Sequence, residues 1–164
     1  MERSFELFGR TLRDCLAKST LILFNQKAIE REGGSFGVLK PDFLESLWAK
    51  IEQAAFYLAQ DEGKPDFVEL VSLAAYLIVK EHPFQDGNKR TSVKVIVNCL
   101  RKLDLVYTGR PIDLARKIEE VAKSDPSQKR EIVLNLAYFL KKHLQKRSFK
   151  KPGPKRPGPG RGWC

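Results

Sequence analysis

The 164 residues of this chain are enough for one ordinary domain, and its shares of apolar (42%) and charged (30%) residues are typical of a globular protein rather than a disordered one. The formal net charge of +10 suggests a nucleic-acid-binding protein, but the positive charge is concentrated at one end of the chain. Residues 141–164 hold nine Lys or Arg and no Asp or Glu. Residues 1–140 carry 21 basic and 20 acidic side chains, which argues against a nucleic-acid-binding surface on the folded body.

The apolar pattern predicts helices throughout, with no internal repeat and no long alternating run of the kind that strands show. Residues 3–31 predict one or two helices, which stop at Gly33-Gly34 because adjacent glycines favour a turn. A further helix is expected over about residues 41–58, since a proline opens it and its apolar side chains share one face. Residues 61–64 are expected to form the next loop.

Residues 66–80 are apolar nearly all the way round and therefore predict a helix buried at the centre of the domain. Pro83 should end it, because proline lacks the N–H that the helix needs and disfavours a helical preceding residue. The next helix, over about residues 88–102, begins with Asn88, a favourable N-cap residue. Two amphipathic helices follow, over 111–122 and over 127 to about 145.

These elements predict an all-α helical domain over residues 1–147. Residues 148–164 form a basic segment rich in Pro and Gly, which cannot bury a core and is expected to be disordered. We expect this tail to contact RNA, ribosomes or another acidic surface.

The cysteines and the N-terminus indicate the compartment. Cys15, Cys99 and Cys164 are odd in number and far apart, so the sequence predicts neither a disulfide framework nor a zinc site, and a reducing cytoplasm is favoured. The N-terminus is acidic where a secretion signal is basic, and no apolar run reaches the roughly 18–20 residues that cross a bilayer. We expect a cytoplasmic protein with no membrane contact.

The chemically informative segment is residues 82–90, His-Pro-Phe-Gln-Asp-Gly-Asn-Lys-Arg, which joins the buried helix to the next one. Lys89 and Arg90 lie in the first turn of that helix, where each cation costs about 0.3–1 kcal/mol at an exposed site. A bound anion would compensate both. Backbone N–H groups near Gly87 and Asn88, the helix dipole and the two cations together predict a phosphate site.

The same segment contains a metal ligand and a base. Asp86 places a carboxylate next to the phosphate site, a combination that suits Mg²⁺, and Gly87 permits close approach of an oxygen to the main chain. His82 carries an imidazole, the side chain best suited to accept a proton from an attacking hydroxyl near neutral pH. Taken singly, His82 is a favourable charge at a helix end and residues 86–88 are a turn with an N-cap. Taken together they predict transfer of a phosphoryl or nucleotidyl group, with Phe84 as an apolar anchor of the loop.

Residues 82–90 resemble the signature of the Fic/Doc family, His-x-Phe-x-Asp/Glu-Gly-Asn-Gly/Lys-Arg, and especially that of its death-on-curing (Doc) branch. Residues 29–38 and 43–46 are similar to the Gly-Gly segment of Doc proteins, and the resemblance covers about residues 20–145. It implies a compact helical bundle of the Fic/Doc type, with a short flap or hairpin from residues 33 to 38 whose candidate substrate-docking residues are Gly33, Gly34, Ser35, Phe36 and Gly37.

The resemblance also implies roles for single residues, with Mg-ATP as the cofactor. His82 would be the general base for a Ser, Thr or Tyr hydroxyl of a protein substrate, and Asp86 would hold Mg²⁺. The phosphates would lie against Gly87, Asn88, Lys89 and Arg90. The flap would dock an extended substrate segment by main-chain pairing, although a plain glycine turn between helices explains the same residues.

Two positions favour the Doc branch. AMP-transferring Fic enzymes usually have Gly at the position of Lys89 and a second Arg at the position of Val93. Doc proteins resemble kinases that move the γ-phosphate of ATP onto a translation factor, and they act as toxins neutralised by a small antitoxin. Gly87 is the choice typical of Fic enzymes, so AMP transfer stays an alternative.

Residues 127–132 approach the Ser/Thr-x-x-x-Glu-Gly/Asn pattern of an inhibitory helix but lack its last residue, so we expect inhibition by a separate antitoxin. A non-enzymatic nucleic-acid-binding module that uses the basic tail is the third hypothesis. A helix-turn-helix would join its helices through about three or four residues, whereas seven lie from His82 to Asn88, which argues against that fold for the body.

Overall fold

The structure is a computed structural model that describes residues 2–62 and 66–147. Its elements follow one another as α1 (Glu2–Cys15), α2 (Lys18–Glu32), α3 (Pro41–Glu62), α4 (Phe67–Glu81), α5 (Asn88–Lys102), β1 (Leu105–Tyr107), α6 (Pro111–Lys123), the 3₁₀ turn η1 (Pro126–Gln128), α7 (Lys129–Lys142) and β2 (Leu144–Lys146). The predicted all-α bundle is confirmed, with one small sheet added. The predicted tail, 148–164, lies outside the described residues.

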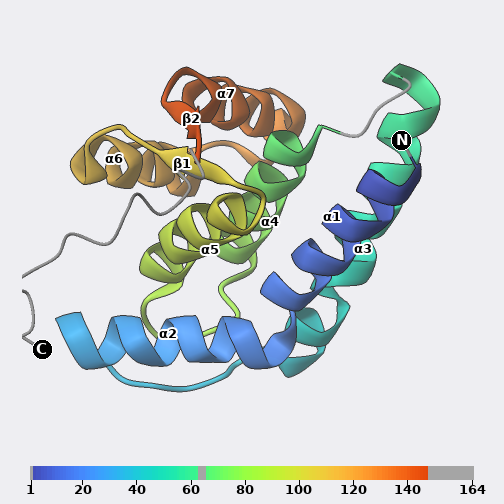
Figure 1. The fold of residues 1–164 in the computed structure, drawn as a ribbon. Coiled ribbons are helices and arrows are strands. Elements are labelled where there is room, and N and C mark those ends of the chain that lie inside the picture. The colour runs from blue at the N-terminus through green and yellow to red at the C-terminus, as the bar shows by residue number, and fades with distance from the viewer. Residues whose placement is uncertain (1, 63–65, 148–164) are drawn as a thin grey trace, which may run out of the picture.

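Helices α4 and α5 occupy the middle of the bundle, with α1 and α3 on one side and α6 and α7 on the other (Figure 1). Helix α2 crosses near the end where α4 passes into α5, so it lies beside the loop of residues 82–87. The carboxylate of Asp66 caps α4 by accepting hydrogen bonds from the N–H groups of Val68 and Glu69 at 3.0 and 3.2 Å. The loop of residues 82–87 is therefore positioned by three helices, α2, α4 and α5.

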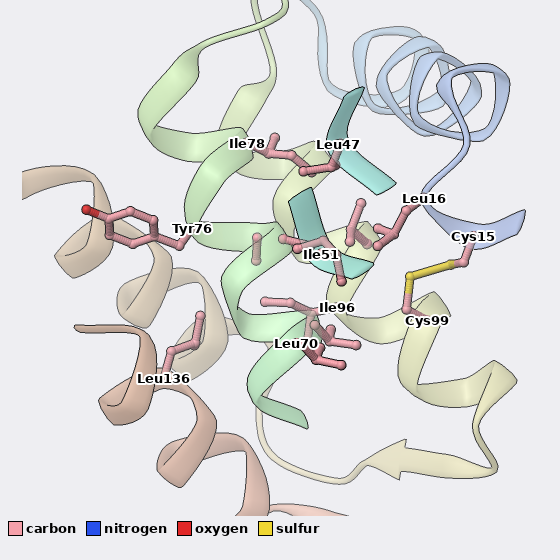
Figure 2. Packing of buried hydrophobic residues seen from close by; sticks show 14 of the residues in the cluster. Cys15, Leu16, Leu47, Ile51, Leu70, Tyr76, Ile78, Ile96, Cys99 and Leu136 are labelled. Carbon is pink, nitrogen blue, oxygen red and sulfur yellow. A yellow bond between two sulfur atoms is a disulfide. The ribbon is translucent and has the colours of Figure 1, made fainter. Parts of the chain in front are cut away.

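The core confirms that α4 is the central helix. Apolar side chains from α3, α4, α5 and α7 meet around it, as Figure 2 shows for Leu47, Ile51, Leu70, Ile78, Ile96 and Leu136. At the end of α4, His82 adopts left-handed dihedrals (φ 51°, ψ 57°) and Pro83 follows, as expected of a residue that cannot continue a helix. This packing fixes where the loop leaves α4 and where it enters α5.

The expectation of unpaired cysteines is wrong for two of the three. Cys15, the last residue of α1, forms a disulfide with Cys99 of α5, and their Cα atoms lie 5.8 Å apart (Figure 2). The two are 84 residues apart in sequence, and only the packing of α1 against α5 brings them together. Cysteine spacing therefore no longer supports a reducing compartment.

Two predicted element boundaries are also wrong. Helix α3 continues to Glu62, so residues 61 and 62 are helical rather than part of a loop. The helix expected over 127–145 is shorter, because it ends at Lys142 and the chain then enters β2, which pairs with β1 in antiparallel fashion. Each strand has three residues, too few for an alternating pattern to reveal. In the described part of the chain no helix is both long enough and apolar enough to span a membrane.

Candidate active site

His82 is held by the end of α4. Its backbone N–H donates to the carbonyl of Ile78, and its ring Nδ1 lies 2.9 Å from the carbonyl oxygen of Val79. Because a carbonyl oxygen only accepts, Nδ1 carries the proton in this contact, and the neutral ring keeps a lone pair on Nε2. The side chain is exposed. The arrangement leaves Nε2 available as a proton acceptor.

Phe84 and Asn88 form the buried half of the loop. Phe84 is fully buried, which confirms its predicted role as the apolar anchor. The Asn88 amide accepts from the Phe84 N–H at 3.0 Å and donates to the Phe84 carbonyl at 2.8 Å. The N-cap of α5 is Gly87, so the prediction that Asn88 is the capping residue is wrong. The Asn88 side chain shapes the loop, and its main-chain N–H remains for an anion because the first turn of a helix has no internal partners.

Asp86 is held from α2 and from the flap segment. Ser35 donates its backbone N–H to Oδ2 of Asp86 at 2.8 Å, and Asn25 of α2 donates its side-chain N–H to the Asp86 carbonyl at 2.8 Å. The other carboxylate oxygen, Oδ1, has no hydrogen bond among the described residues. The carboxylate is therefore oriented while one oxygen stays available. A Cβ at Gly34 (φ 114°) would lie 3.2 Å from Cβ of Asp86, which explains the glycine.

The expected flap lies against the loop by main-chain pairing. Leu39 donates to the Pro83 carbonyl at 2.7 Å, Gln85 donates to the Gly37 carbonyl at 2.8 Å, and Val38 forms an isolated antiparallel bridge with Phe84. Residues 33–37 form no strand of their own. Substrate docking by the flap stays a prediction, and the structure adds that the flap supports the loop.

Lys89 and Arg90 have protein partners. Lys89 forms an ion pair with Glu119 of α6, Nζ to Oε1 2.9 Å, and the hydrogen bond from Lys89 lowers the pKa of Glu119 below its ordinary value. Arg90 donates through Nη1 to the carbonyls of Ala28 and Gly33 at 3.0 and 2.9 Å, at the C-terminal end of α2 where a cation is favourable. The premise that only a bound anion compensates these two cations is therefore wrong. Their partners come from distant parts of the chain.

One cleft of about 480 Å³ collects the candidate chemistry, a size in the range of small-molecule sites. Its first wall is the loop with the start of α5, namely His82, Gln85, Asp86, Gly87, Asn88, Lys89, Arg90 and Val93. Its second wall is α6, with Ile112, Ala115, Arg116, Ile118 and Glu119. The structure thus brings all six predicted loop residues to one hollow, whereas the flap residues 33–37 do not line it.

Two contributors were missed at the sequence level. Asn25 is fully buried between α2 and the loop, where it also donates to the Thr91 hydroxyl at 3.1 Å. Helix α6 supplies a whole wall of the cleft. Asn25 could have been identified from the sequence, because a polar residue on the inward face of a helix needs a buried hydrogen-bonding partner. No local pattern marks α6, because only the tertiary fold places it opposite α5.

An exposed imidazole, an oriented carboxylate and a helix N-terminus share one cleft, an arrangement expected of helical enzymes that transfer phosphate-containing groups. The chain belongs to the Fic/DOC family, whose sequence model matches residues 15–100. This range contains α2 to α4, the loop and most of α5. No curated protein matches the chain.

Members of this family are typically transferases that use ATP, so family membership indicates a nucleotide or phosphate transferase. The match is to the family as a whole.

Proposed function

We propose that the protein is a Doc-like enzyme that transfers the γ-phosphate of Mg-ATP to a Ser, Thr or Tyr hydroxyl of a protein target. The observation that carries this proposal is the single cleft in which His82, Asp86 and the start of α5 face α6. The presence of Lys89 at the second position of α5, where AMP-transferring relatives usually have Gly, favours phosphate over AMP.

In this proposal His82 is the base. The substrate hydroxyl oxygen attacks the γ-phosphorus, the bond from that phosphorus to the bridging oxygen breaks, and ADP leaves with the electron pair. The hydroxyl proton passes to Nε2 of His82, the ring nitrogen opposite the Nδ1 that faces the Val79 carbonyl. The role of Nδ1 is to fix the ring and its tautomer.

The phosphates bind at the start of α5. Main-chain N–H groups of its first turn and the Lys89 ammonium supply hydrogen bonds and positive charge. Arg90 is already bound to the end of α2, so its contribution is to connect α2 and the flap to this turn and to add its charge. The protein thereby holds the triphosphate from one side.

The donor set also fits Mg²⁺. No cluster of three or more His, Cys, Asp or Glu side chains exists in the described part of the chain, and Mg²⁺ prefers one or two carboxylates completed by phosphate oxygens and water. Asp86 would hold the ion through the carboxylate oxygen that Ser35 does not bind. When bound, the ion neutralises charge on the phosphate oxygens.

AMP transfer is the second candidate, and Gly87 is the residue that favours it. In this chain Gly87 also has a local cause, because its φ is 77° and a Cβ there would lie 3.1 Å from Nδ2 of Asn25. Its presence therefore says little about the group that is transferred.

The test uses ATP labelled separately at the α and γ phosphates and incubated with the protein in a lysate. Label from γ on a protein band, absent with His82→Asn, supports the proposal. Label from α instead indicates AMP transfer. Label from neither position, with a folded protein, overturns both enzymatic functions.

We extend the proposal to a toxin whose target is a translation factor and whose inhibitor is a small separate antitoxin. The position of Ser127 and Glu131, the residues closest to the inhibitory pattern, supports the second part, because they line a different hollow at the start of α7. Expression of the wild type should arrest growth and inhibit translation, whereas His82→Asn should do neither. Arrest by both proteins would contradict a toxic role for the transfer reaction.

A further inference from the structure

Positive charge collects at the end of α5 that lies away from the cleft. Arg101 and Lys102 are the last two residues of this helix, and both are exposed. The chain then reverses at Asp104, whose left-handed dihedrals (φ 60°) are tolerated by aspartate better than by most residues. This turn leads from the end of α5 directly into β1 (Figure 1).

Backbone hydrogen bonds place the end of β2 at the same turn. The Asp104 N–H donates to the Arg101 carbonyl at 3.0 Å, and the Asp104 carbonyl accepts from the Arg147 N–H at 2.8 Å. Lys146 pairs with Leu105 in the antiparallel register of β1 and β2. Two cations from α5 and two from the end of β2 therefore meet around one turn. We call Arg101, Lys102, Lys146 and Arg147 the basic patch.

Acidic side chains do not balance the basic patch. Residues 101–107 and 144–147 hold four Lys or Arg and one Asp, a net charge of +3. Arg101, Lys102 and Lys146 form no ion pair within residues 2–62 and 66–147. Other surface cations of the protein do pair with carboxylates, namely Lys18, Lys40, Lys89, Lys117 and Lys141.

Local stability explains the basic patch only in part. A helix C-terminus favours Arg101 and Lys102, and a lysine at an exposed strand edge, such as Lys146, discourages pairing with other chains. Neither effect requires the cations of α5 and β2 to lie together. Mutual repulsion among them is relieved when an anion binds.

The surroundings of the basic patch indicate the kind of anion. Protein interfaces use aromatic and apolar anchors at their centre, and membrane-surface segments insert an apolar face. None of the large apolar side chains that are exposed in the described part of the chain belongs to residues 101–107 or 144–147. Binding to a nucleic-acid backbone needs positive charge alone.

We propose that the basic patch binds the phosphate backbone of a nucleic acid. The chain continues from Arg147 into residues 148–164, which add five Lys or Arg and no Asp or Glu. Helix α5 has 15 residues, so the basic patch lies about 20 Å from the start of α5 and a bound nucleic acid leaves the cleft open. The near-neutral total of residues 1–140 argued against such a surface, but the fold concentrates cations that this total conceals.

The test measures affinity over a range of salt concentrations. Fluorescence anisotropy compares binding of the full chain to labelled oligouridine RNA and to duplex DNA of the same length, which separates the two sources of phosphate. The triple variant Arg101→Gln, Lys102→Gln, Lys146→Gln should bind both at least about tenfold more weakly at physiological salt. On RNA its plot of log affinity against log salt should flatten by about 2, because each phosphate contact on a single strand contributes about 0.7.

The matched control removes the same charge elsewhere. Lys18→Gln, Lys40→Gln, Lys117→Gln replaces three cations that each pair with a glutamate, and it should change the affinity by about twofold at most. If the first triple variant does not fold, Lys146→Gln alone keeps the test available, because this exposed lysine should contribute about 0.7 to the slope on RNA.

Four results would overturn the proposal. Equal losses in the two triple variants would reduce the effect to net charge. Unchanged affinity in the patch variant would assign the binding to another part of the chain. Wild-type protein that binds neither nucleic acid would leave the basic patch without this ligand. Tighter binding of the wild type to vesicles of phosphatidylcholine and phosphatidylserine than to either nucleic acid would assign the basic patch to a membrane surface. All four leave the proposed transfer reaction untouched, because no ATP is present.

Discussion

The two sides of the loop differ in how the protein holds them. On the α2 side, Asn25 binds the Asp86 carbonyl at 2.8 Å, and Arg90 binds two carbonyls at the end of the helix. On the α6 side, the polar contact to the start of α5 among the described residues is one ion pair between Lys89 and Glu119, whose side chains are 46% and 47% exposed. One side is tied by hydrogen bonds that are mostly buried or half-buried, and the other faces an open cleft.

This difference indicates that one side of the loop positions the candidate catalytic groups and the other side binds the ligand. A buried hydrogen bond is costly to break, because the group left behind loses its partner without regaining water. An exposed ion pair contributes little to stability and exchanges readily with an incoming ion. The α2 side therefore sets the geometry of Asp86 and the start of α5, while the α6 side is free to receive a ligand. Gly87 belongs to the first side, since a Cβ there would crowd Asn25 and Ile29 at 3.1 and 3.3 Å.

The largest effect is expected at His82, which contributes chemistry to the open side and little to stability. His82→Asn should reduce the rate of label transfer by at least about 100-fold, because it removes the base. The melting temperature should stay unchanged, since asparagine tolerates the left-handed dihedrals of this position better than alanine does. Transfer rates and thermal melts of the same preparations provide the measurement, and comparable rates would remove His82 from the mechanism.

A loss of stability is expected on the tightly held side. Asn88→Ala removes both partners of the buried Phe84 backbone, and each unsatisfied group costs about 1–3 kcal/mol, so the protein should lose about 2 kcal/mol or more. Asn98→Ala is the matched control on the same helix, because its amide only donates to the Lys94 carbonyl within α5. Denaturant unfolding of the two variants measures the contrast, and equal stabilities would contradict the buried role of Asn88.

Lys89→Gly tests whether the open side selects the reaction. The change removes a phosphate contact and also leaves Glu119 as an unpaired anion at the cleft, so γ-phosphate transfer should fall by about tenfold or more, with some AMP transfer possible in its place. Folding should persist, because the glycine costs up to about 1 kcal/mol and the exposed ion pair that is lost contributes little to stability. Separate α- and γ-label assays measure both reactions.

Adding Glu119→Gln to Lys89→Gly separates the lost phosphate contact from the effect of the unpaired Glu119 carboxylate. If the double variant recovers γ-phosphate transfer, the unpaired carboxylate caused the loss. Undiminished γ transfer by folded Lys89→Gly would show that the lysine does not set the reaction.

The sequence allowed the tightly held elements to be predicted better than their connections. The buried α4, the stop at Pro83 and the anchor Phe84 follow from local patterns, because apolar periodicity and proline act on their own neighbours. The partners of Lys89 and Arg90 could not be predicted. Glu119 and the carbonyls of Ala28 and Gly33 lie 30 to 62 residues away, and only the packing of α2 and α6 against α5 brings them close.

The smallest effect is expected at Glu119, the other half of the exposed pair. Glu119→Gln frees the Lys89 ammonium and removes a negative charge beside the proposed phosphate site, so the protein should bind inorganic tripolyphosphate about two- to fivefold more tightly at neutral pH. The melting temperature should hardly change, because both side chains of the pair are exposed. Calorimetric titration of the wild type and Glu119→Gln in parallel measures the ratio of their affinities.

The pH dependence of that ratio identifies its cause. Lys89 lowers the pKa of Glu119 in the folded protein, so the carboxylate stays ionised at neutral pH and is protonated only in the acid range below its ordinary value of 4.5. Because this pKa is lowered, the Lys89–Glu119 ion pair is fully present above the ordinary pKa of Glu119. It is lost as the pH falls through the pKa that Glu119 has in the folded protein. The affinity ratio should therefore approach one in strong acid. The protonation of tripolyphosphate also changes with pH, but it affects both proteins equally and therefore cancels in the ratio. Weaker binding by Glu119→Gln at neutral pH would show the opposite role, with Glu119 holding Lys89 in place for the phosphate.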